Sequence, residues 1–96
     1  MCTDVLFIHL LSGVSSQMYI TLPQSYSWLP SSAGNVPEKA LQAGETSSSE
    51  PLFVARGMVN GEMCIGKVHP SHGCAYFPWG GDEHAVQHYE VLCFSD

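Results

Sequence analysis

The dipeptide Asn60-Gly61 constrains the fold of this chain more than any other feature of its sequence. It separates two segments that are rich in apolar residues, Leu52–Val59 and Glu62–Val68. A two-residue type I′ turn requires positive φ at both central positions, and Asn followed by Gly tolerates this better than other pairs. The sequence therefore predicts a β-hairpin in which Val59 lies opposite Glu62.

The alternation of side chains along a strand then divides this hairpin between two faces. One face is expected to carry Val54, Arg56, Met58, Met63, Ile65 and Lys67. The other is expected to carry Phe53, Ala55, Gly57, Val59, Cys64 and Val68, and also Glu62 unless a bulge intervenes. Gly66 is a candidate bulge site, because a glycine inside a strand often marks one.

The rest of the chain follows the same pattern of short aromatic and β-branched bursts, separated by Gly, Pro, Ser and Asn. No stretch holds apolar residues at helical spacing for three turns. The tracts 45–50 and 78–81 are expected to be loops. We predict an all-β fold of antiparallel strands and hairpins, with strands at Val5–Leu11, Gln17–Leu22, Ser27–Pro30, Leu41–Ala43, Leu52–Val59, Glu62–Val68, Ala75–Pro78 and Tyr89–Phe94.

Size and composition indicate one small domain. The chain has 96 residues, of which 45% are hydrophobic and 12% charged, so it is expected to fold rather than to stay disordered. Its four cysteines are too sparse for a disulfide scaffold, and we expect reduced, largely buried thiols.

Charge and hydropathy argue against two classes of partner. The net charge is −6 and the chain holds only three Lys and Arg residues, which disfavours a nucleic-acid surface. The apolar run Val5–Leu11 is far shorter than the roughly 20 residues that span a bilayer, so no membrane span is expected. The same run has weak similarity to a secretory signal, but Asp4 stands where a positive charge is wanted, which favours a strand. The compartment stays open between cytoplasm and secretion.

A dense series of short motifs runs from Trp28 to Leu92. The series resembles the DM-nine repeat family, which includes an oyster mannose-specific lectin and natterin-like proteins, and it covers about two thirds of the chain. The resemblance implies an all-β domain over residues 24–96 that binds mannose or mannose-rich glycans in pattern recognition, without a cofactor. The motifs are Trp28, Gly34-Asn35-Val36-Pro37, Ala40, Ala43-Gly44, Pro51-Leu52-Phe53-Val54-Ala55-Arg56, Gly61-Glu62-Met63, Gly66-Lys67-Val68, Tyr76, Pro78, Gly80-Gly81, Glu83 and Tyr89-Glu90-Val91-Leu92.

The resemblance also implies a sugar site. Its lysine falls on Lys67, and a supporting glutamate falls on Glu62. The family's acidic residue falls on Thr46, with Glu45 immediately before it. A threonine hydroxyl is a weaker acceptor of sugar hydroxyls than a carboxylate. Either Glu45 replaces the missing acid, or this repeat binds sugar weakly or not at all.

Three further side chains have sequence-based expectations. Tyr76 or Trp79 is a candidate aromatic wall for a sugar, although an aromatic in a β domain is more often part of the core. Arg56 is expected to form a structural ion pair with Glu83 or Glu90 rather than to bind a ligand.

The first alternative to a lectin is a degenerate repeat that serves as an interaction or oligomerisation module. The resemblance implies dimers or association with another repeat. Residues 1–23 are expected to form an extension of two strands that pack on the domain, in place of strands that a neighbouring repeat contributes in tandem relatives.

A metal site and an enzyme are less favoured. Six residues give the second half a Cys and His content typical of metal sites, but their spacing does not match structural zinc sites, so no metal is expected. The sequence contains no phosphate loop, nucleophile elbow or paired-carboxylate motif, and we expect no enzymatic activity. The six residues are Cys64, His69, His72, Cys74, His84 and His88.

Overall fold

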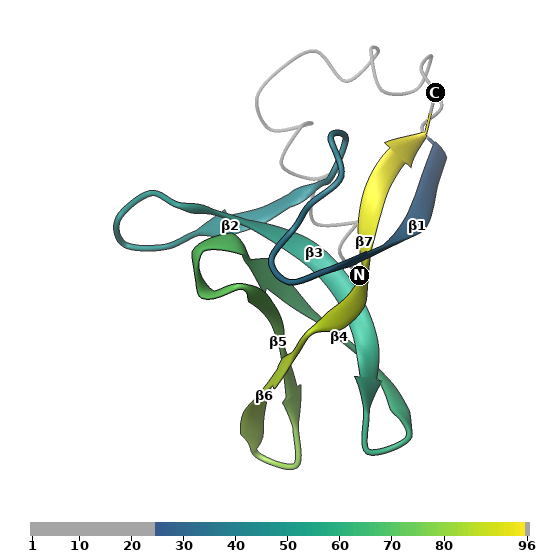
Figure 1. The fold of residues 1–96 in the computed structure, drawn as a ribbon, viewed down its shortest axis with the longest axis vertical. Helices are drawn as coiled ribbons and strands as arrows, with labels where there is room; N and C mark the ends of the chain where they lie inside the picture. Colours follow the sequence, from purple (N-terminus) through teal and green to yellow (C-terminus); the bar gives the residue numbers. More distant parts are fainter. Residues whose placement is uncertain (1–24, 96) are drawn as a thin grey trace, which may run out of the picture.

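The computed structural model describes residues 25–95, so the two strands expected at Val5–Leu11 and Gln17–Leu22 and the extension 1–23 lie outside the described residues. Seven antiparallel strands form a single sheet, which confirms the all-β prediction (Figure 1). No helix of the described part is long and apolar enough to cross a membrane. The elements are β1 (Ser25–Ser32), β2 (Gln42–Glu45), β3 (Pro51–Val59), β4 (Glu62–His69), the 3-10 turn η1 (Pro70–His72), β5 (Cys74–Trp79), β6 (Asp82–Val86) and β7 (His88–Ser95).

The strand order of the sheet is β1-β7-β3-β4-β5-β6, and β2 pairs with β3 beside this path. Strands β3 to β6 are joined as consecutive hairpins, whereas β7 returns to lie between β1 and β3. The sheet is strongly bent, and the β3–β4 and β5–β6 turns point the same way (Figure 1). The strands from β4 to β6 carry the candidate site described below.

The β3–β4 hairpin has the register that the sequence predicts. Val59 pairs with Glu62 and Val54 pairs with Lys67. Asn60 and Gly61 have φ values of 50° and 82°, as a type I′ turn requires. The division of side chains between two faces is therefore confirmed.

Gly66 is not a bulge, so that prediction was wrong. The β3–β4 pairing passes through it without interruption, with Gly66 opposite Ala55. A Cβ atom at Gly66 would collide with the backbone carbonyl of Tyr76 and would lie 2.6 Å from the ring of Phe77. Glycine is present because another strand passes close to its backbone.

The sequence predicts a loop at residues 78–81, but these residues belong to a second hairpin, formed by β5 and β6. Pro78 and Trp79 belong to β5, and only Gly80 and Gly81 form the turn, with φ values of 62° and 85°. Strand β6 follows and was not predicted, because its residues are mostly polar and it lies at the edge of the sheet. Its register places Glu83 opposite Pro78.

Two apolar clusters pack on the two faces of the sheet. Phe77, in the larger cluster, is the largest side chain that is completely buried among the described residues. Cys64, Cys74 and Cys93 are free thiols, and the last two are buried, as expected; Cys2 lies outside the described residues. The larger cluster contains Ala55, Val59, Val68, Ala75, Phe77, Tyr89, Val91 and Cys93, and the smaller contains Leu41, Val54 and Leu92.

Candidate functional site

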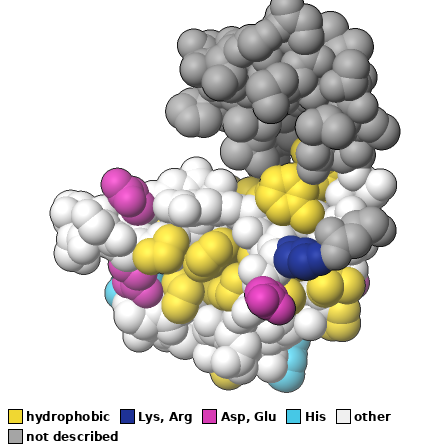
Figure 2. Space-filling model, turned by 90° about the horizontal axis from the view of Figure 1, so that it is seen from above, with side chains coloured by type: hydrophobic (Ala, Val, Ile, Leu, Met, Phe, Trp, Pro, Cys, Tyr) yellow, Lys and Arg dark blue, Asp and Glu magenta, His cyan; other side chains and the backbone are white. Residues whose placement is uncertain are grey.

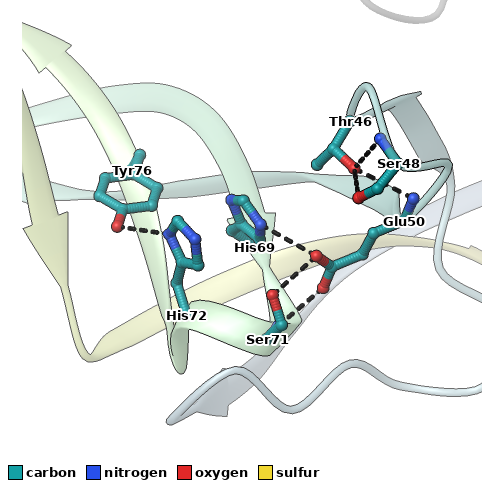
Figure 3. Close-up of polar contacts among 7 residues, drawn as sticks. All are labelled: Thr46, Ser48, Glu50, His69, Ser71, His72 and Tyr76. Atoms are coloured by element: carbon teal, nitrogen blue, oxygen red, sulfur yellow. Dashed lines mark hydrogen bonds and ion pairs between the residues drawn. The ribbon is translucent and has the colours of Figure 1, made fainter.

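A carboxylate immediately before β3 connects two loops. Glu50 accepts hydrogen bonds from the backbone amide and the hydroxyl of Ser71, both at 2.7 Å, and contacts His69 Nε2 at 3.0 Å (Figure 3). The two hydrogen bonds from Ser71 and the nearby His69 imidazole hold the pKa of Glu50 below its ordinary value. The β2–β3 loop is thereby anchored to the η1 turn.

Two imidazoles continue this network across the sheet face. The rings of His69 and His72 are stacked, with centroids 3.5 Å apart and an angle of 12° between their planes. His72 Nδ1 lies 2.8 Å from the hydroxyl of Tyr76 (Figure 3). Hydrogen bonding to the Cys74 thiol, together with desolvation and the negative charge of Glu83, raises the pKa of the Tyr76 phenol.

Lys67 lies at the end of this network. It pairs with Tyr76 across β4 and β5, so the two side chains leave the same face of the sheet. The Lys67 ammonium lies 3.4 Å from Glu83 Oε2, and the two side chains are 42% and 54% exposed. We refer to Lys67, Tyr76 and Glu83 as the Lys67 site, which presents a donor, an aromatic ring and an acceptor to solvent.

The structure places Glu62 away from the Lys67 site. Glu62 and Lys67 are five positions apart on one regular strand and therefore leave opposite faces. The Glu62 carboxylate accepts a hydrogen bond of 2.8 Å from Trp79 Nε1, next to the turns of the two hairpins. Trp79 in turn has its ring edge-on to His84, and Tyr76 is the aromatic that lies beside Lys67.

The two remaining predicted site residues lie at the β2–β3 loop. Glu45 is exposed and pairs with Pro51 at the end of β2. The Thr46 hydroxyl accepts hydrogen bonds from the backbone amides of Ser48 and Glu50, at 3.2 and 3.1 Å. Thr46 therefore shapes the loop that delivers Glu50 to the His69 imidazole (Figure 3).

Sequence reasoning did not assign Glu83 and Glu50 to the site. Glu83 occurs in the family motifs, and recognition of Gly80-Gly81 as a hairpin turn would have placed it on the face of Tyr76. Glu50 carries no local signal, because its partners are 19 and 21 residues away.

Arg56 has the structural role that the sequence predicts. Its Nε lies 2.7 Å from Glu90 Oε1, and its guanidinium lies 4.5 Å from the centre of the Trp28 ring. Both contacts join β3, β7 and β1 rather than reaching the Lys67 site.

Three of the described histidines each direct a ring nitrogen to a protein partner. His69 contacts Glu50, His72 contacts Tyr76, and His84 Nε2 lies 3.0 Å from the carbonyl oxygen of Trp79. Within residues 25–95, no three His, Cys, Asp or Glu side chains form a group that could hold a metal ion.

Comparison with known proteins decides the family. A model of the DM9 repeat, the DM-nine repeat to which the motifs point, matches residues 12–86. The chain belongs to the DM9 repeat family. The match begins upstream of Trp28, where the motif series starts, and it includes Lys67, Tyr76 and Glu83.

This DM9 repeat is also similar to natterins of Thalassophryne nattereri. It is 32% identical to natterin-3 over 73 residues, which is 76% of the chain. It is 35% identical to natterin-4 over 65 residues, which is 68% of the chain. The chain spans only 18% and 14% of the lengths of these two relatives, so the similarity concerns one part of each.

Proposed function

We propose that this DM9 repeat is a non-enzymatic carbohydrate-binding domain that recognises mannose or mannose-rich glycans in pattern recognition. The observation that carries the proposal is the exposed pairing of Lys67 and Glu83 beside Tyr76. Neighbouring sugar hydroxyls each need a donor or an acceptor, and the Lys67 site offers both side by side. The choice of mannose rests on the family resemblance.

The ion pair is suited to opening around a ligand. Its atoms are 3.4 Å apart and both side chains are exposed, so the pair contributes little to the stability of the free protein. A sugar that enters between Lys67 and Glu83 exchanges this weak contact for charge-assisted hydrogen bonds, which are stronger than neutral ones. The ring of Tyr76 supplies an apolar wall.

Glu83 also provides a carboxylate in place of the family's acidic residue, whose position is occupied by Thr46 in this chain. The hydroxyl of Thr46 already accepts two backbone hydrogen bonds in its own loop, which reduces its capacity to accept a sugar hydroxyl. In our proposal Glu83 supplies the carboxylate that Thr46 lacks, and Glu45 and Glu62 have no direct part in binding.

The test is a calorimetric titration with mannose, run beside galactose and with a chelator present. Lys67→Ala and Glu83→Gln are each expected to weaken mannose binding at least tenfold, about 1.4 kcal/mol. Asp82→Asn is the matched control, because it removes a negative charge from the adjacent, exposed position of β6. Absence of binding by the wild type, or unchanged binding by both site variants, would overturn the proposal.

A second candidate function is association with another copy or another repeat. Met58 and Met63 face one another across the β3–β4 hairpin and are each 53% exposed, and Ile65 on the same face is 49% exposed. Figure 2, which views the molecule from the end opposite the β3–β4 and β5–β6 turns, shows that apolar side chains also gather at that end. Large exposed apolar patches are typical of protein interfaces.

Light scattering after size-exclusion chromatography tests the second candidate. If Met58→Thr with Ile65→Thr converts a dimer into a monomer while mannose binding by each site is retained, the domain has both functions. A wild-type monomer over the whole concentration range would exclude self-association through this face.

A further inference from the structure

The stacked imidazoles of His69 and His72 join two ends of one network. His69 ends β4 and holds Glu50 of the β2–β3 loop, whereas His72 ends η1 and holds the hydroxyl of Tyr76. Their rings overlap with centroids 3.5 Å apart (Figure 3). The hydroxyl of Tyr76, beside Lys67, is therefore linked to Glu50 through two imidazoles in contact.

We propose that His72 positions Tyr76 in the Lys67 site and that protonation of both stacked imidazoles weakens sugar binding. The inference rests on the proposed function and specifies how that site is regulated. Imidazoles ordinarily change charge between pH 5 and 8, which is outside the ordinary range of lysine and carboxylate side chains.

The charges around the stacked imidazoles determine whether a proton on His69 or a proton on His72 disrupts the stack. From the β2–β3 loop, Glu50 faces His69 and offsets one positive charge. From β5, the phenol of Tyr76 meets His72 Nδ1 at 2.8 Å. Within the described residues no carboxylate is hydrogen-bonded to His72, so a second proton places two like charges face to face without compensation.

Two more charges act on the same face. Lys67 leaves β4 two positions before His69, on the same side of the sheet, and adds positive charge. Glu83 of β6 lies against Lys67 and acts on Tyr76. Glu83 is paired with Lys67, so it does not offset a charge on His72.

The η1 turn lets His72 respond without disturbing the core. None of the three residues of η1 is buried, and the His72 side chain is exposed, so its ring can rotate away from His69 into solvent. Glu50 keeps the backbone of the turn in place through the Ser71 amide. The expected result is local: Tyr76 loses its hydrogen-bond partner, and the wall of the Lys67 site becomes less fixed.

The test is mannose titration of the full chain at pH 8, 7, 6 and 5. Wild-type affinity is expected to fall at least tenfold from pH 8 to pH 5. His72→Asn is expected to bind with little pH dependence, because its side-chain oxygen can accept the Tyr76 hydroxyl and takes up no proton. His84→Gln, which alters a histidine beside Trp79, is the matched control and is expected to keep the wild-type pH profile.

Failure of the inference can be told from failure of the proposed function. Wild-type binding that is independent of pH, or a His72→Asn profile equal to the wild type, overturns the inference and leaves the lectin proposal intact. If no sugar binds at any pH, the lectin proposal fails, and NMR decides the positioning claim alone. Tyr76 ring signals that shift as His72 titrates support it, and signals that do not respond overturn it.

Discussion

The ring of Phe77 lies so close to Gly57 that a Cβ atom at this glycine would come within 2.8 Å of ring atom Cε2. The same ring lies over Gly66 on the neighbouring strand. Because Phe77 is completely buried, it cannot move aside without disturbing the larger apolar cluster.

Gly66→Ala is therefore expected to lower the free energy of unfolding by about 2 kcal/mol or more, because its Cβ would meet backbone as well as the Phe77 ring. Gly57→Ala should cost less, because only the ring is in its way. Urea denaturation gives the values. Gly44→Ala, where a Cβ has open space, should change stability by less than about 0.5 kcal/mol; an equal loss at Gly44 and Gly66 would refute the packing explanation.

Tyr89→Phe should lower the free energy of unfolding by about 0.5–1 kcal/mol. The buried Tyr89 hydroxyl donates a hydrogen bond of 2.9 Å to the carbonyl of Asn35, and burial raises the pKa of the phenol. The cost stays modest because the Asn35 carbonyl also accepts from the Ser31 hydroxyl, which remains in the variant. A loss well above this range in urea denaturation would mean that the phenol holds more than this one contact.

The Arg56–Glu90 pair should show a coupling of up to about 1 kcal/mol in a double-mutant cycle of Arg56→Gln and Glu90→Gln. Both side chains are about one-third exposed, which limits the Coulomb gain. The coupling should shrink in 1 M salt, since ions screen exposed charges. Arg56→Lys should not restore the wild-type stability, because lysine has no planar group to lie over Trp28. If the stability loss of the double variant equals the sum of the losses of the two single variants, the two side chains are not coupled and the ion pair is contradicted.

Glu50 should stabilise the β2–β3 loop at neutral pH and lose this effect in acid. A carboxyl group whose pKa is lowered on folding stabilises the native state above its unfolded pKa, and the stabilisation disappears as the pH falls through the folded pKa. Hydrogen exchange of the Ser71 amide, which donates to Glu50, reports this directly. Its protection should decrease below pH 4.5 and should be low at every pH in Glu50→Gln. Glu45→Gln, an exposed carboxylate of β2, should behave as the wild type.

The β3–β4 hairpin was predictable residue by residue because its turn fixes the register, and the register fixes the faces. Strand β6 escaped detection because an edge strand needs few apolar residues, and its Gly80-Gly81 turn was interpreted as a loop. Gly66 was misassigned for a different reason. A glycine in a strand indicates either a bulge or a close approach, and only the position of Phe77 distinguishes the two.

The candidate site likewise combines positions that the sequence predicts with contacts that it does not predict. Lys67 is placed by the hairpin register, so the sequence put it on the correct face of the sheet. Glu83 needs strand β6 to reach Lys67, and the stack of His69 on His72 needs a three-residue turn between two strands. These relationships have no periodicity in the sequence, because they arise where separate elements meet.

The place of β7 in the sheet has a consequence for biosynthesis. It is the last of the seven strands along the chain, yet it lies between β1 and β3 and contributes Tyr89, Val91 and Cys93 to the interior. Strand β1 pairs with β7, with Ser25 opposite Ser95. The first described strand therefore has no neighbour in this sheet until the last strand has been synthesised. Before β7 has been synthesised, the edges of β1 and β3 that it later covers are unpaired. Pairing of strands so far apart in the sequence is slow. Such a domain can complete its sheet only once β7 has been synthesised, and a molecular chaperone that shields β3 until β7 emerges would protect it from aggregation.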